Sequence, residues 1–212
     1  MKISQNRVRF NYLGMIKLLE SIRIMNGRIC QLGYHEERCN QARIKLFSTN
    51  QKLRLREKII IPELYQKGLV KCRLIYSTDI EDISFQQYEI RIIDKIKIVN
   101  SDSISYPFKF EERKELDVLF ANRMDCDEIM IIKNGLVTDA YYYNYVFQKG
   151  KEYFTPKIPL LEGVMRSSLI LSKRIVKKDI FASDLHQFDA IHLINAMTPL
   201  GKIIIYPNQI TP

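Results

Sequence analysis

The chain has 212 residues, of which 46% are hydrophobic and 27% are charged, a balance that is ordinary for a globular protein with a sizeable core. It contains no run of about 18 apolar residues, which excludes a membrane-spanning helix. The net charge of +9 would suit a nucleic acid, but the basic residues are interleaved with acids and form no basic block. We therefore expect no nucleic-acid partner, and a small anionic substrate or cofactor as the better use of the charge.

The N-terminus, MKISQNRVRFNYLG, lacks an apolar core and a small-residue cleavage site, so we expect no secretion signal. The four cysteines form neither a Cys-x-x-Cys pair nor another metal-ligand spacing; they stand at positions 30, 39, 72 and 126. Isolated cysteines of this kind are typical of reduced thiols. The sequence therefore predicts a cytoplasmic protein without a metal site.

The first hundred residues mix strand and helix patterns. Residues 16–25 have strand character and end at Asn26-Gly27, which predicts a two-residue hairpin turn. Residues 34–47 carry apolar groups at helical spacing, and a second helix is expected from about residue 51 to Pro62 or, resuming after it, to Gly68. Further strands are expected at 69–76, 85–93 and 95–99. The serine-rich segment 100–105 is the expected linker between two lobes.

The second half adds helices and a series of short strands. Helices are expected at 111–123 and 164–173, and Asn134-Gly135 predicts a second hairpin turn. Strands are expected at 129–132, 136–138, 143–147, 152–154, 191–194 and 202–206. The whole pattern predicts an α+β protein with a small N-terminal lobe, 1–102, and a C-terminal lobe, 106–212.

Six segments stand out by their order and spacing: ESIRIMNGRI, HEER, YPFKFEERKEL, DCDEIMIIKNGLVTDAYYYNYVF, YFTPKIPLLEGVMR and INAMTPL. In this order they resemble the class IV aminotransferases, the fold-type IV enzymes that use pyridoxal 5'-phosphate (PLP). That family includes branched-chain and D-amino-acid aminotransferases and 4-amino-4-deoxychorismate lyases. The resemblance covers about residues 15–205. It implies a two-lobed fold like that of D-amino-acid aminotransferase, a PLP cleft between the lobes, and a homodimer.

The resemblance also implies the catalytic residue. Lys109 matches the family lysine that forms a Schiff base with PLP, and its flanking residues Phe108 and Phe110 would help to lower its pKa. Asp139 matches a family glutamate that pairs with the pyridine nitrogen and keeps the ring an electron sink. Taken alone, such a lysine more often lies at a strand edge with its ammonium in water, and Thr-Asp more often marks a turn.

Three further groups match residues that bind the cofactor in the family. Arg38 matches the arginine of a His-x-x-Arg helix that contacts the phosphate, although His35 and Arg38 alone would be ordinary surface charge. Gly163, Val164 and Met165 match a helix entrance whose backbone N–H groups hold the same phosphate. Ala196 belongs to a segment, Asn-Ala-Met, that resembles the Asn-Ala-Leu of the lyases. Asn144 matches a family asparagine for which we expect a structural role.

Two residues are expected to face the substrate, Ser21 on the first hairpin and Met197 beside Ala196. The Asn-Ala-Met-x-Pro segment and the chain length favour a lyase of folate biosynthesis, with a C–N bond cleavage that gives p-aminobenzoate and pyruvate. An aminotransferase of branched-chain or D-amino acids is the alternative, and a non-catalytic basic binding module on the same fold is a third. The glycine- and arginine-rich loop of many members is replaced here by Ser-Thr-Asp-Ile-Glu-Asp at 77–82.

Overall fold

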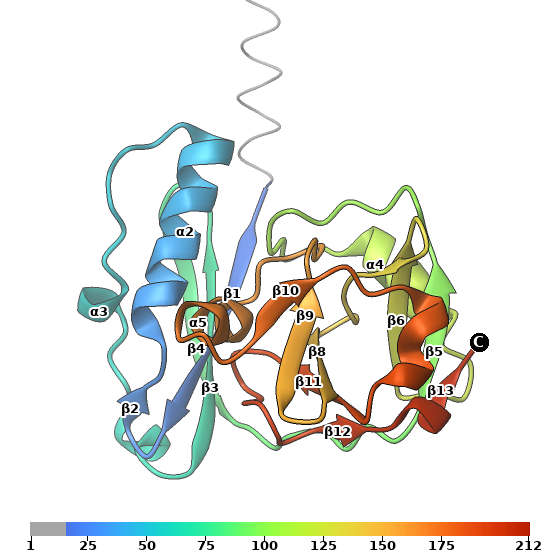
Figure 1. Cartoon of the computed structure of the whole chain (residues 1–212). Coiled ribbons are helices and arrows are strands. Elements are labelled where there is room, and N and C mark those ends of the chain that lie inside the picture. The colour runs from blue at the N-terminus through green and yellow to red at the C-terminus, as the bar shows by residue number, and fades with distance from the viewer. Residues whose placement is uncertain (1–15) are drawn as a thin grey trace, which may run out of the picture. The chain divides into compact units, whose positions relative to one another are not determined.

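The computed structural model describes residues 16–212, which form two compact units (Figure 1). The first unit comprises the described part of Met1–Glu89 together with Phe108–Glu112, and the second comprises Ile90–Pro107 and Arg113–Pro212. These limits differ from the expected lobes 1–102 and 106–212. Within residues 16–212, no helix has the length and apolar character needed to cross a membrane.

The first unit is built on a four-stranded antiparallel sheet in the order β2-β1-β3-β4. Its strands are β1 (Leu18–Met25), β2 (Arg28–Ile29), β3 (Leu69–Tyr76) and β4 (Ile80–Gln87). The hairpin turn at Asn26 and Gly27 is confirmed, with φ values of 48° and 72° that fit the two left-handed positions of a type I′ turn. At Gly27 a side chain would also collide with Gln66, whose Oε1 lies 2.3 Å from an ideal Cβ.

Helix α2 (Leu32–Phe47) covers one face of this sheet, as Figure 1 shows. Residues of β1 alternate between buried and half-buried, because successive side chains of a strand point to opposite faces. The buried set packs with α2 in one core, whose members include Leu18, Ile22, Ile24, Cys39, Ala42, Val70, Cys72, Leu74 and Tyr76. The predicted helix over 34–47 is therefore confirmed, and it starts two residues earlier.

The predicted helix between residues 51 and 62 is wrong. That segment contains one helical turn, α3 (Leu55–Lys58), and a 3-10 turn, η1 (Glu63–Tyr65). The side chain of Asn40 bonds both the N–H and the C=O of Leu53, so these backbone groups are withdrawn from a helical ladder. Leu53, Leu55 and Ile59 point into the core without the spacing of an amphipathic helix.

The strand predicted over 85–93 is only partly present, because β4 ends at Gln87. This strand also begins earlier than predicted, at Ile80, which lies in the segment 77–82 that replaces the family loop. The next strand is β5 (Ile96–Asn100). Between them, the Asp127 carboxylate accepts the N–H groups of Asp94 and Lys95. Side-chain bonds of this kind compete with the pairing of strands for backbone groups, and the chain between β4 and β5 is irregular.

The second unit contains two sheets, ordered β10-β9-β8-β11-β12 and β13-β5-β6-β7. The strands besides β5 are β6 (Glu128–Lys133), β7 (Leu136–Val137), β8 (Asn144–Lys149), β9 (Glu152–Pro156), β10 (Val176–Lys178), β11 (Ala190–Ile194), β12 (Ile204–Ile205) and β13 (Ile210–Thr211). Members of both sheets share one apolar core, which includes Met130, Ile132, Tyr145, Phe147, Ile191 and Leu193. The short strands β10 and β13 were not predicted.

Two α-helices belong to this unit, α4 (Lys114–Ala121) and α5 (Val164–Leu171). Two 3-10 turns, η2 (Ala182–Gln187) and η3 (Pro207–Gln209), were not predicted. Helix α4 begins later than the predicted residue 111 because the chain up to Glu112 is extended and bonded to the first sheet. The N–H of Leu19 donates to Lys109 O at 2.8 Å, and the N–H of Glu111 donates to Lys17 O at 2.8 Å.

Candidate functional site

A buried cluster of three charged or titratable side chains joins β1 to α2 in the first unit. Glu20 is fully buried and accepts a hydrogen bond from Arg38 Nε at 2.8 Å, with a second guanidinium nitrogen 2.5 Å away. His35 Nδ1 lies 2.6 Å from the other Glu20 oxygen. The carboxylate therefore holds both side chains at once, and it fixes the plane of the guanidinium.

The charges of this cluster follow from its surroundings. Burial alone would raise the pKa of Glu20, but the Arg38 charge and the His35 hydrogen bond hold it at about 2. Burial lowers the pKa of His35, and the charges of Arg38 and Lys109 act in the same direction. His35 is therefore neutral and donates from Nδ1, while its buried Nε2 has no partner within residues 16–212.

Lys109 lies on the extended segment Phe108–Glu112, which continues the first sheet along the start of β1. Phe110 forms an isolated bridge with Leu18, and Phe108 and Phe110 pack against the core beneath α2. Lys109 itself is half-buried and is close enough to act on the pKa of His35. The first unit thus brings Lys109 into the neighbourhood of Arg38 and its partners.

Ser21 lies on the face of β1 opposite to Glu20. It is half-buried and stands directly across from Arg73 of β3. Arg73 in turn forms an ion pair with Glu111, whose Oε1 lies 2.8 Å from its guanidinium. Ser21 therefore lies opposite a residue that is paired with the segment that follows Lys109.

Asp139 of the second unit is the centre of another buried polar network. Its Oδ1 accepts Asn144 Nδ2 at 2.7 Å and its Oδ2 accepts the N–H of Leu161 at 2.8 Å. Asn144 also donates to Leu161 O at 3.0 Å, so one amide ties the carboxylate and the chain before α5 together. Burial raises the pKa of Asp139 to about 7 in spite of these bonds.

The entrance of α5 lies beside the same asparagine. An ideal Cβ on Gly163 would lie 1.8 Å from Asn144 Oδ1, so only glycine fits this contact. Gly163, Val164 and Met165 are buried, no described side chain caps the helix, and its first turn contains no acid. The start of a helix carries partial positive charge on its N–H groups, and this one is poised for an anion.

Ala196 and Met197 form a tight turn between β11 and Pro199. Asn195 Oδ1 accepts the N–H groups of both Met197 and Thr198 at 2.9 Å. Asn195 Nδ2 donates to the C=O of Tyr142 at 3.1 Å, which links this turn to the segment between Asp139 and Asn144. The second unit therefore brings Ala196 and Met197 together with the Asp139 segment.

Three residues of these networks were missed or left without a role by the sequence. Glu20 was missed, although a glutamate whose neighbours on the same strand face are apolar is an unusual signal. Glu128 was missed as well: it is buried, its Oε1 accepts the N–H of Tyr141 at 3.1 Å, and burial raises its pKa to about 7. His35 was placed on the helix surface, whereas it is buried because it faces Glu20.

The family profile described as Amino-transferase class IV matches residues 17–204. The chain belongs to this family. A protein of Haemophilus influenzae whose function is uncharacterized is 36% identical over 188 residues, which is 88% of this chain and 100% of that protein. This class IV aminotransferase chain is an enzyme, and the family's cofactor is PLP.

Solved structures agree with this membership. A candidate 4-amino-4-deoxychorismate lyase from Haemophilus somnus 129pt is 34% identical and covers 88% of this chain and 98% of its own, with a TM-score of 0.76. The PLP-bound form of a hypothetical aminotransferase from Mycobacterium tuberculosis has a TM-score of 0.72 at 15% identity, covering 92% of this chain and 83% of its own. The latter likeness concerns the fold alone.

Each unit of this class IV chain has groups that suit PLP chemically. In the second unit, the uncapped entrance of α5 suits a phosphate. In the first unit, Arg38 has a guanidinium of fixed orientation, a group that binds phosphates. Asp139 already accepts two hydrogen bonds, but a carboxylate has about four acceptor positions, which leaves capacity for a pyridinium N–H. A cation at that point would also favour the ionised form of Asp139, because an opposite charge offsets the burial.

Proposed function

We propose that this enzyme is a lyase of the 4-amino-4-deoxychorismate type, which releases pyruvate and p-aminobenzoate. The observation that carries the proposal is the Asn195–Thr198 turn, whose Asn-Ala-Met sequence resembles the lyases and whose side-chain bonds fix it against Tyr142. The similarity to the Haemophilus somnus protein supports the same choice. The cofactor would be held by Arg38, Asp139 and Gly163 to Met165, with Lys109 as the amine that joins it.

The chemistry of the products fixes which bond breaks. Because p-aminobenzoate keeps the nitrogen of the substrate, pyruvate must leave by cleavage of the C–O bond between the ring and the enolpyruvyl group. The C–N cleavage expected above is therefore wrong on chemical grounds. A proton leaves the ring carbon that bears the amino group, the C–O bond breaks, and one proton is added to the methylene carbon to give the methyl group of pyruvate.

Bound PLP would supply the electron sink that makes the proton on the amino-bearing carbon of the substrate ring acidic. Lys109 is the residue that we expect to remove that proton, because a deprotonated amine can act as a general base. The same amine can then carry the proton to the methylene carbon. Asp139 would keep the negative charge next to the cofactor ring that this proton transfer requires, and Asn144 would hold the Asp139 carboxylate in place.

The direct test supplies purified, PLP-loaded protein with 4-amino-4-deoxychorismate and measures both products. We expect pyruvate and p-aminobenzoate in a ratio of one to one, and no turnover in Lys109→Ala. Transfer of an amino group from branched-chain or D-amino acids to 2-oxoglutarate, without pyruvate release, would instead establish the aminotransferase alternative. Absence of both reactions in a protein that binds PLP would overturn the proposal.

Two broader expectations belong to this proposal. We expect a homodimer, as the family resemblance implies, and light scattering of the PLP-loaded protein at micromolar concentration would measure it. A pure monomer in that measurement contradicts the expectation. A cytoplasmic location also stays a prediction, which rests on the four free cysteines, and a fractionation of the native cells would test it.

A further inference from the structure

The second face of the first sheet is rich in positive charge. On β1 and β3 the residues that alternate with the core beneath α2 include Ser21, Arg23, Lys71 and Arg73. In the antiparallel register Arg23 stands directly opposite Lys71, and Ser21 stands directly opposite Arg73. Residues opposite one another in such a pair lie on the same face, so three cations share this surface.

This arrangement is unfavourable for the sheet by itself. Like charges directly opposite in an antiparallel pair are destabilising. The Nε of Arg23 is buried and has no hydrogen-bond partner within residues 16–212. Burial lowers the pKa of Lys71, and the charge of Arg73 lowers it further. A buried donor without a partner and crowded cations are what an anion-binding surface has before its anion is bound.

The neighbouring groups offset only part of this charge. Glu111 pairs with Arg73 at 2.8 Å. Asp82 of β4 lies one pair further along, opposite Ile75, and is exposed. Lys71 Nζ lies 5.6 Å from the centre of the Tyr88 ring, a contact that favours a cation but does not neutralise it. Arg23 and Lys71 therefore remain available to an external anion.

The surface adjoins the segment that carries Lys109. The N–H of Leu19 bonds to Lys109 O, and Leu19 shares the face of β1 with Ser21 and Arg23. Glu111, two residues after Lys109, is the group that binds Arg73. An anionic group on a molecule that reacts at Lys109 would thus meet cations on the same sheet.

We propose that Arg23, Lys71 and Arg73 form a carboxylate-binding subsite for the substrate. The substrate class is an amino compound with at least one carboxylate remote from the reacting amino group, and Arg23 and Lys71 would bind that carboxylate from both sides. Arg73, which Glu111 orients, would complete the subsite next to Ser21. This inference rests on the proposed function, since 4-amino-4-deoxychorismate carries two carboxylates.

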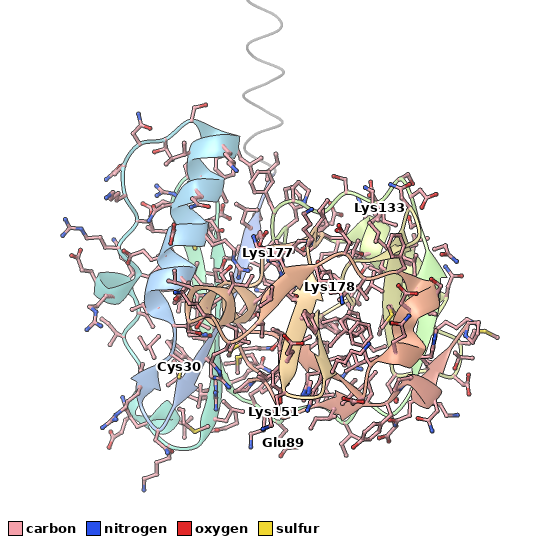
Figure 2. The ribbon with its side chains drawn as sticks, viewed as in Figure 1. Cys30, Glu89, Lys133, Lys151, Lys177 and Lys178 are labelled. Carbon is pink, nitrogen blue, oxygen red and sulfur yellow. The ribbon has the colours of Figure 1, made fainter. Side chains whose placement is uncertain are left out.

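The test measures binding of chorismate, a dianion with a hydroxyl in place of the amino group, to the PLP-loaded protein by titration calorimetry. Lys71→Gln and Arg23→Gln are each expected to weaken chorismate binding about tenfold to a hundredfold, as loss of a charge-assisted hydrogen bond does. Lys177→Gln is the matched control, because Lys177 is an exposed lysine of β10 in the second unit (Figure 2), and we expect a change of less than about twofold.

A second measurement separates binding from folding. Because Lys71 stands opposite Arg23, Lys71→Gln is expected to unfold at the same or a higher temperature than the wild type while it loses chorismate affinity. If the unfolding temperature and the chorismate affinity of Lys71→Gln both fell, Lys71 would have a structural role, and the proposed subsite would be overturned. Unchanged affinity in Lys71→Gln and Arg23→Gln would overturn it as well.

The outcomes also separate this inference from the proposed function. If the wild type produces pyruvate and both variants do so with unchanged KM, the lyase stands and the subsite is wrong. If the wild type produces none but binds chorismate through Arg23 and Lys71, the subsite stands and the lyase is wrong.

Discussion

Glu20 of the first unit and Asp139 of the second are both buried among partners, and these two carboxylates are held in opposite ways. Glu20 meets a guanidinium and an imidazole, and its pKa is about 2. Asp139 meets one side-chain amide and one backbone N–H, and its pKa is about 7. Both are almost fully buried, so the difference lies in the charge of the partners. A buried carboxylate that accepts hydrogen bonds only from neutral donors is only partly ionised near neutral pH. The binding of a cation beside it would therefore lower its pKa and increase its ionised fraction.

The largest expected effect is the loss of the cofactor. Lys109→Ala should abolish the visible absorption band of the PLP-loaded protein, because the amine that joins the cofactor is removed. Borohydride reduction of the wild type should attach the label to the peptide that contains Lys109. Both buried clusters should stay intact in the variant, as an unchanged unfolding curve would show. A label on another lysine would contradict the assignment.

The ion pair of the first unit is tested by removing its cation. Arg38→Met leaves Glu20 buried without its main partner and should lower the free energy of unfolding by about 3–5 kcal/mol. Urea unfolding of the protein without PLP measures this. The double variant Glu20→Gln with Arg38→Met should recover part of the loss, and a double variant as unstable as the single one would mean that packing, not charge, is responsible.

The contributions of Asp139 and Glu20 to the free energy of unfolding should change with pH in opposite directions. The pKa of Asp139 is raised from an ordinary 3.8 to about 7, so its contribution to stability is lost as pH rises between these values. Asp139→Asn should therefore gain stability relative to wild type from pH 4 to 7, by up to about 4 kcal/mol. Glu20 contributes stability above pH 4.5, and this contribution is lost as the pH falls toward 2. The difference in unfolding free energy between Glu20→Gln and the wild type should therefore be smallest in acid.

Catalysis offers a separate test of Asp139. Asp139→Asn should still form the visible PLP band, but its turnover should fall about tenfold to a hundredfold, because the charge next to the cofactor ring is lost. Stopped assays of pyruvate release measure the rate. Turnover equal to that of the wild type would leave Asp139 as a structural residue of the turn.

The smallest effect concerns the glycine beside Asn144. Gly163→Ala places a Cβ 1.8 Å from Asn144 Oδ1 and should cost about 1–3 kcal/mol of unfolding free energy. Gly33→Ala is the matched control, because nothing lies within 4 Å of its Cβ, and we expect no loss there. The cost at Gly163 should shrink in an Asn144→Ala background, since the colliding amide is then absent.

The sequence predicted elements with strong periodicity and failed where side chains bind backbone. Strand 69–76 and the helix that follows Cys30 were predicted because their apolar patterns are clear. The segments near Leu53 and Asp94 failed because Asn40 and Asp127, distant in sequence, bind their backbone groups. Lys109 and Asp139 were named through motifs, whereas Glu20 became visible only when its partners were seen in space.

The return of Phe108–Glu112 to the first sheet has a consequence for biosynthesis. The chain passes from the first unit to the second after Glu89 and returns to the first unit for Phe108–Glu112. From Arg113 on, it belongs to the second unit. On a ribosome, the hydrogen bonds between Phe108–Glu112 and the start of β1 therefore cannot form until Glu112 has emerged, although β1 to β4 are already available. Neither unit can be obtained as one uninterrupted fragment, so a stalled or clipped chain that ends near Glu89 would lack the segment that carries Lys109.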